Sequence, residues 1–140
     1  MKVNGRAVYL DTSAFVKLIV AEPDTPALVR FLARWPYRVS SALLRTEAVR
    51  AIKRAGYGSE LGRTRRLLAD VQLIRMDDLL LDRAGELEPI EVRSLDAIHV
   101  ATALAVGDEL GVFVTYDERL AEAGRKAGLA VEAPGSSVSA

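Results

Sequence analysis

The sequence predicts an α/β fold, a three-layer α/β/α sandwich built on a mainly parallel five-stranded sheet. Short apolar runs alternate with stretches of helical periodicity along nearly the whole chain, which is typical of parallel strands joined by right-handed helical crossovers. These runs occupy residues 8–10, 37–40, 71–76, 111–115 and 129–132. A chain of 140 residues, 50% of them hydrophobic, can bury one such core but has no room for a second.

Helix signals fill the segments between these strands. Asp11 ends the first strand and leads into a helix over residues 13–21, which Pro23 closes. Asp24 or Thr25 caps a second helix, which runs up to the second strand. By similar start and stop signals, further helices are predicted over residues 41–56, 60–68, 78–87, 95–106 and 118–126.

Composition limits both the chemistry and the location. There is no cysteine and only one histidine, so disulfides, thiolate metal sites, a cysteine nucleophile and all-imidazole metal sites are excluded. The sequence has no apolar stretch of about 18 residues and no signal-peptide pattern, so we expect a soluble cytoplasmic protein without membrane contact. We expect one domain over residues 1–132, followed by a flexible C-terminal tail over residues 133–140.

The net charge is zero, but the middle third of the chain is basic. Between Arg30 and Arg66 there are ten Arg or Lys residues and only two acids, Glu47 and Glu60. One interpretation is that these cations cover solvated helix faces with their long side chains. The other is a surface that contacts phosphate, since the guanidinium fork of Arg pairs well with phosphate oxygens.

Four acids depart from their local patterns. Asp11 and Asp117 follow the first and fourth strands, where parallel sheets bind their ligands. Glu47 lies at the margin of the apolar face of its helix, so it is expected to look toward protein. Asp96 begins a helix whose next ten residues carry no formal charge, and this helix should be buried nearly all round.

Asp96 is the most informative of these acids. An acid in the first helical turn gains about 0.3–1 kcal/mol from the helix N-terminus. Effective burial of an ion can cost several kcal/mol, so a cation is expected nearby.

Each acid also has a structural interpretation. Asp11 and Asp117 could be N-caps, Asp96 could be an ordinary first-turn acid, and Glu47 could pair with Arg50. Clustered together, however, the four acids would repel one another strongly. A hard divalent cation with oxygen ligands relieves that repulsion, and Mg²⁺ or Mn²⁺ is the matched choice.

Four sequence motifs carry a family resemblance. They are Leu10-Asp11-Thr12-Ser13-Ala14, Thr46-Glu47-Ala48, the run from Leu95-Asp96-Ala97 to Ala103, and Val114-Thr115-Tyr116-Asp117-Glu118-Arg119-Leu120. In this order and spacing the sequence resembles PIN-domain ribonucleases, and most closely the VapC-type toxins of toxin–antitoxin pairs. The resemblance spans residues 8 to about 131.

The resemblance implies a parallel sheet in the order 3-2-1-4-5 and a metal-dependent endoribonuclease that hydrolyses RNA phosphodiesters, with tRNA or rRNA as substrate. Asp11 and Asp96 would be the principal Mg²⁺ or Mn²⁺ ligands and Asp117 a further ligand. Glu47 would bind a second ion or orient the attacking water, and Ser13 and Thr115 would be supporting hydroxyls. It also implies an antitoxin partner, hence a heteromeric complex, and a homodimer.

The single histidine, His99, has two possible roles. His99 lies three residues after Asp96, so a catalytic or ligand role is possible, but a buried histidine bonded to a neighbour is favoured.

A phosphoacceptor receiver domain would need a Lys after the last strand, where Glu132 and Ala133 stand. A haloacid-dehalogenase-like phosphatase would need an acid where Ser13 stands. The alternatives kept are a stand-alone PIN endonuclease that processes or decays RNA without an antitoxin, and a catalytically idle binding subunit of a regulatory complex.

Overall fold

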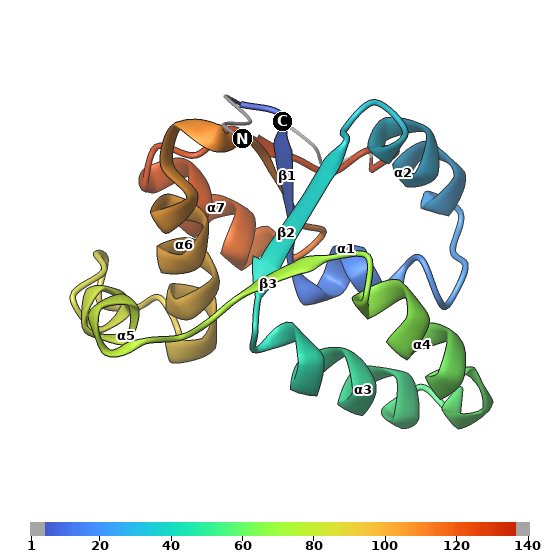
Figure 1. Cartoon of the computed structure of the whole chain (residues 1–140). Coiled ribbons are helices and arrows are strands. Elements are labelled where there is room, and N and C mark those ends of the chain that lie inside the picture. Colours follow the sequence, from blue (N-terminus) through green and yellow to red (C-terminus); the bar gives the residue numbers. More distant parts are fainter. Residues whose placement is uncertain (1–4, 137–140) are drawn as a thin grey trace.

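The structure, a computed structural model that describes residues 5–136, is a five-stranded sheet with helices on both faces (Figure 1). The strands are β1 (Ala7–Leu10), β2 (Tyr37–Ser41), β3 (Gln72–Ile74), β4 (Leu110–Val114) and β5 (Val131–Glu132). The helices are α1 (Thr12–Val16), α2 (Thr25–Leu32), α3 (Leu44–Arg54), α4 (Leu61–Leu68), α5 (Asp78–Gly85), α6 (Ser94–Val106) and α7 (Glu118–Lys126), with short 3-10 turns η1 (Gly58–Glu60) and η2 (Gly107–Glu109).

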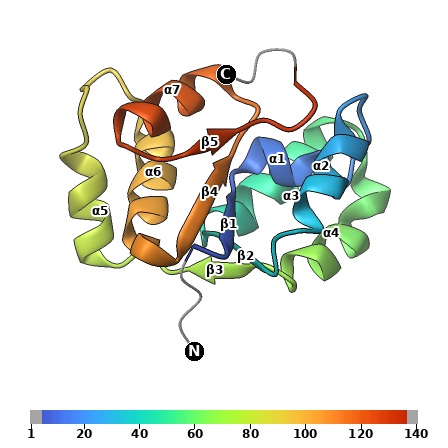
Figure 2. The same cartoon turned by 90° about the horizontal axis from the view of Figure 1, so that it is seen from above.

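All strand pairs are parallel, and their order is β3-β2-β1-β4-β5. The predicted fold class and strand order are therefore confirmed. Seen from above, α5, α6 and α7 lie on one side of the sheet and α1 to α4 on the other (Figure 2).

The alternation of side chains along β1 supplies both faces of the core. Tyr9 packs with Phe113 and Val100 on the side of α6 and α7, whereas Val8 and Leu10 pack on the side of α1 and α2. All four residues of β1 are buried, as expected for the central strand of a sheet covered on both faces.

The pairing of β1 with β4 determines what meets at the carboxyl edge of the sheet. The register is irregular between Ala7 and Val8 but regular from there to the pair Leu10 and Val114. The amide of Asp11 then donates to the Val114 carbonyl at 3.2 Å. The residues directly after the two strands are thus held side by side.

The first helix is shorter than predicted. A helix over residues 13–21 was expected, but α1 ends at Val16 and continues as turns. The Arg63 side chain donates to the carbonyls of Leu18 and Ile19 at 3.0 and 3.3 Å. A cation from α4 therefore satisfies carbonyls that a longer helix would have bonded internally.

The expectation that the helix after Asp96 is buried nearly all round is wrong at its ends. The middle of α6 is buried, but the side chains of Leu95 and Leu104 are 50% and 43% exposed. The helix packs against α5, α7 and the sheet along its middle, so its first and last turns reach past these neighbours.

The C-terminal segment lies only partly within the described residues. The hydroxyl of Tyr116 donates to the Pro134 carbonyl at 2.7 Å. Residues 137–140 lie outside the described part, so the flexible tail over residues 133–140 stays a prediction. Over residues 5–136, no helix combines the length and the apolar composition needed to cross a membrane.

Candidate active site

Asp11 lies at the carboxyl end of β1 and is the N-cap of α1. Its side chain accepts hydrogen bonds from the Ala14 amide at 2.9 Å, from Ser13 Oγ at 2.8 and 2.9 Å and from Thr115 Oγ1 at 2.6 Å. The residue is 3% exposed, and no Lys or Arg of residues 5–136 forms an ion pair with it. Burial raises the pKa of Asp11 above its ordinary value, although the hydrogen bonds from Thr115, Ala14 and Ser13 oppose this.

Thr115 links Asp11 to Asp117. Its Oγ1 donates to Asp11 and accepts from the Asp117 amide at 3.1 Å. The Asp117 side chain is exposed and accepts from the amides of Arg119 and Leu120 at 2.9 and 3.2 Å, so it is the N-cap of α7. The interpretation of Asp117 as an N-cap is therefore correct.

Glu47 projects from the first turn of α3 into a set of side-chain donors. Its Oε1 accepts from Thr12 Oγ1 at 2.6 Å and lies 2.8 Å from His99 Nε2. Partial burial alone would raise the pKa of Glu47, but the hydrogen bonds from His99 and Thr12 outweigh it and lower the pKa below the ordinary value. Glu47 does not pair with Arg50, which was its alternative partner.

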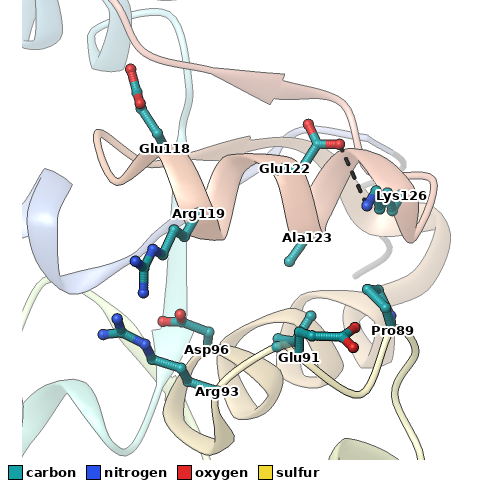
Figure 3. Close-up of a pocket in the computed structure, with 10 residues that line it drawn as sticks. Pro89, Glu91, Arg93, Asp96, Glu118, Arg119, Glu122, Ala123 and Lys126 are labelled. Carbon is teal, nitrogen blue, oxygen red and sulfur yellow. Dashed lines mark ion pairs between the residues drawn. The ribbon is translucent and has the colours of Figure 1, made fainter.

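Asp96 lies in the first turn of α6 and lines a pocket between this helix and α7 (Figure 3). The side chains of Arg93 and Arg119 extend toward Asp96 from either side in this view. Burial raises the pKa of Asp96, and the negative charge of Asp117 raises it further, while His99 and Arg93 act in the opposite direction. Arg93 opposes the rise in the pKa of Asp96 only in part, and no Lys or Arg of residues 5–136 forms an ion pair with this acid.

The four acids, from separate segments, border the same edge of the sheet. Thr115 is hydrogen-bonded to both Asp11 and Asp117. The adjacent hydroxyls of Ser13 and Thr12 in α1 donate to Asp11 and to Glu47. Besides burial, the negative charges of Asp117 and Glu47 raise the pKa of Asp96, and such repulsion is typical of a site that takes a cation.

By donor type these acids suit a hard divalent cation, because Mg²⁺ and Mn²⁺ prefer carboxylate oxygens. Over residues 5–136, however, no three Asp, Glu or His side chains are close enough together to hold an ion as they stand. Binding an ion would therefore require side-chain movements toward a common point, and Asp117, Asp96 and Glu47 are all at least partly exposed, whereas Asp11 is buried.

Thr12 and Arg93 were not singled out from the sequence, whereas His99 is buried and bonded to neighbours, as was favoured. Thr12 bonds to Glu47, His99 bonds to both Glu47 and Tyr9, and Arg93 lies beside Asp96. The position of His99, one helical turn after Asp96, was the available signal. That turn places Asp96 at the pocket and His99 in the core, 3% exposed.

Comparison with known proteins identifies the family. The PIN domain family model matches residues 8–126. Ribonuclease VapC46 of Mycobacterium tuberculosis (strain ATCC 25618 / H37Rv) is 49% identical over 128 residues, which cover 91% of this chain and 98% of that protein. The chain belongs to the VapC family of PIN-domain ribonucleases. Ribonuclease VapC47 of the same species (strain CDC 1551 / Oshkosh), 35% identical over 92% of this chain and 98% of that protein, agrees with this assignment.

Solved structures of VapC proteins share the fold. M. tuberculosis VapC20, described as a sarcin-ricin loop cleaving toxin, superposes with a TM-score of 0.69 at 19% identity, over 84% of this chain and 95% of that one. A chain of VapBC2 from Rickettsia felis was solved with a DNA fragment from the promoter of the pair. It gives a TM-score of 0.68 at 15% identity, over 91% of this chain and 98% of that one. At these identities the likeness concerns the fold alone.

Proposed function

We propose that this VapC protein is a metal-dependent endoribonuclease and the toxin of a toxin–antitoxin pair. The observation that carries the proposal is the convergence of four acids on one sheet edge, with Asp11 buried and without a cationic partner among the described residues. A site with unrelieved negative charge does not bind a polyanion such as RNA by itself. A divalent cation between the acids and a phosphate resolves this conflict.

Each acid has a proposed task. Asp11 and Asp96 are the principal ligands of Mg²⁺ or Mn²⁺, Asp117 is a further ligand, and Glu47 holds a second ion or orients the attacking water. When bound, the ion supplies Lewis-acid stabilisation of the charge that develops on the phosphate. Ser13 and Thr115 keep the Asp11 carboxylate oriented by the hydrogen bonds described above.

The pocket beside Asp96 is lined by glutamates and by two arginines, which can contact the RNA backbone. Arg93 and Arg119 present guanidinium groups there, and guanidinium groups bind phosphate oxygens with two parallel hydrogen bonds. We propose that these two arginines position a phosphate next to the acids, which compensates for the negative charge of the site during RNA binding.

Structures of similar proteins support the proposed partners. The R. felis VapC structure was determined as a VapBC pair, and a toxin–antitoxin complex from Klebsiella pneumoniae has a TM-score of 0.63 to this chain at 21% identity, over 79% of this chain and 86% of that one. We therefore propose an antitoxin that forms a heteromeric complex with a homodimer of this chain in the cytoplasm. Structured RNA, either tRNA or rRNA, is the proposed substrate, in line with the rRNA loop in the description of VapC20.

Cleavage by the purified chain tests the enzymatic part. With Mg²⁺, the wild-type chain should cut tRNA or rRNA at defined positions, and Asp11→Asn or Asp96→Asn should slow cleavage by about 100-fold or more because each removes a charge that serves the transition state. Asp77→Asn is the matched control, since Asp77 is also an N-cap acid but caps α5, which carries none of the four acids. Intact RNA with the wild-type chain, or equal rates for all variants, would refute the proposal.

Growth tests the toxin part separately. Expression of the wild-type chain alone should arrest growth, and Asp96→Asn should relieve the arrest. Co-expression of a small protein encoded next to this chain should also restore growth. Cleavage in vitro together with normal growth on strong expression would favour a stand-alone PIN endonuclease instead.

A further inference from the structure

His99 connects the hydrophobic core to the active-site edge. It projects from α6 and is 3% exposed, with Nδ1 at 2.7 Å from the Tyr9 hydroxyl and Nε2 at 2.8 Å from Glu47 Oε1. Both ring nitrogens are therefore used, one toward the central strand and one toward an acid of the site. A histidine that only filled space would leave these nitrogens without partners.

The direction of each hydrogen bond follows from the partners. An ionised carboxylate can only accept, so the proton between Glu47 and His99 belongs to Nε2. In the neutral imidazole, Nδ1 then has a lone pair and accepts from the Tyr9 hydroxyl. Burial raises the pKa of Tyr9, as does the charge of Asp11, so its hydroxyl keeps the proton that this bond requires.

Tyr9 is a rigid origin for this chain of hydrogen bonds. Its side chain is fully buried in β1, its ring stacks on Phe113 at 4.9 Å between centroids, and the His99 ring meets it edge-on at 5.8 Å. The core thus fixes the position of the His99 ring, and the hydrogen bond from Nε2 in turn fixes the position of the Glu47 carboxylate.

Glu47 is held through one oxygen only. Both Thr12 Oγ1 and His99 Nε2 bond to Oε1, while Oε2 accepts no side-chain hydrogen bond from residues 5–136. Two donors on one oxygen fix the rotation of the carboxylate and leave Oε2 available. This is the arrangement expected for a carboxylate whose second oxygen serves an ion or a water.

We propose that His99 is a positioning residue of the active site, which orients Glu47 through its Nε2 while the Tyr9 hydroxyl fixes its tautomer. The inference rests on the proposed nuclease function and assigns to the single histidine a role that acts through Glu47, without contact to RNA. Partners that orient the carboxylates of metal sites typically change metal affinity or activity by about 10–100-fold when they are removed.

Substitutions at both ends of the hydrogen-bond chain test this role. His99→Leu fills the space without either bond and should lower kcat for RNA cleavage by about 10–100-fold, with an unchanged KM for RNA, because His99 is buried away from the substrate. His99→Gln can accept from Tyr9 and donate to Glu47, so it should recover much of the loss. Tyr9→Phe should lower kcat by less than His99→Leu and by more than His99→Gln, although Tyr9 touches no acid of the site.

Binding of Mn²⁺, followed by electron paramagnetic resonance, provides a second readout that does not depend on cleavage. His99→Leu should weaken Mn²⁺ binding or lower its stoichiometry, and His99→Gln should restore it. Thr64→Val is the control for loss of a buried hydroxyl, because Thr64 is buried in α4 and bonds to the Glu60 carbonyl. It should leave both readouts unchanged.

The outcomes separate this inference from the proposed function. If the wild-type chain cuts RNA and His99→Leu retains both its kcat and its Mn²⁺ binding, His99 has no positioning role. A His99→Gln variant as impaired as His99→Leu would also overturn it. If His99→Leu does not fold, His99→Gln and Tyr9→Phe decide the question. A wild-type chain that leaves RNA intact overturns the proposed function and the role of His99 together.

Discussion

Thr115→Val removes a single hydroxyl from the centre of the site without changing the shape of the side chain. Thr115 is 1% exposed, and its Oγ1 both donates to Asp11 Oδ2 at 2.6 Å and accepts from the Asp117 amide at 3.1 Å. Ser13 Oγ also lies 3.4 Å from Thr115 Oγ1, and the substitution leaves no cavity, so the loss of stability reports mainly on the hydrogen bonds of this hydroxyl.

The structure gives the size and the pH dependence of this loss. A hydrogen bond to a charged group contributes about 1.5–3 kcal/mol to stability, and Asp11 Oδ2 keeps only its bond from Ser13. For a chain of this length, such a loss corresponds to about 4–10 °C in Tm. Burial raises the pKa of Asp11 and the Thr115 hydrogen bond lowers it, so the variant raises this pKa further. The stability difference should therefore be largest at neutral pH and shrink as the pH falls and Asp11 takes up its proton.

Urea unfolding at neutral and acidic pH, with Thr64→Val as the control, measures this effect. Thr64 is equally buried, but its hydroxyl donates only to the Glu60 carbonyl at 2.8 Å, so its loss should cost about 0.5–1 kcal/mol at every pH. If the two variants lose the same stability at both pH values, the hydroxyl of Thr115 does not stabilise an ionised Asp11, and the electrostatic account of the site is wrong.

Three further predictions concern the fold. Because burial raises the pKa of Asp11 in the folded state, stability should fall as the pH rises through that pKa, and Asp11→Asn, which cannot ionise there, should remove this decrease in Tm; a variant that shows the same decrease would contradict this. Phe113→Ala removes a fully buried ring stacked on Tyr9 and should cost about 3–5 kcal/mol in urea unfolding, whereas a cost below 1 kcal/mol would mean that the core there can collapse. Gly128 follows α7 with a φ of +92°, so Gly128→Ala should lower the free energy of unfolding by about 1 kcal/mol. An unchanged urea midpoint would show that the backbone relaxes there.

The parts of the structure that follow from local patterns could be predicted from the sequence. The strands and the fold class agree with the expectation, because period and strand-end signals depend on neighbouring residues, whereas the strand order was implied by the family resemblance. The contact between Asp11 and Thr115 was also within reach, since both follow neighbouring strands of the predicted sheet.

The partners of Glu47 could not be predicted in the same way. A helical wheel places Glu47 at the margin of an apolar face, but its donors come from α1 and α6, and their approach depends on how these helices pack. For the same reason, the sequence did not show that α1 ends at Val16, where a side chain from α4 replaces internal bonds.

The irregular register between β1 and β4 lies at the opposite end of these strands from the acids. A mismatch in strand length can be absorbed there, between Ala7 and Val8, while three consecutive residue pairs remain aligned up to Leu10 and Val114. A shift of one residue in the aligned portion would turn the side chains after these strands to opposite faces of the sheet and separate Asp11 from Thr115. The three aligned pairs before the site therefore hold Asp11 beside Thr115.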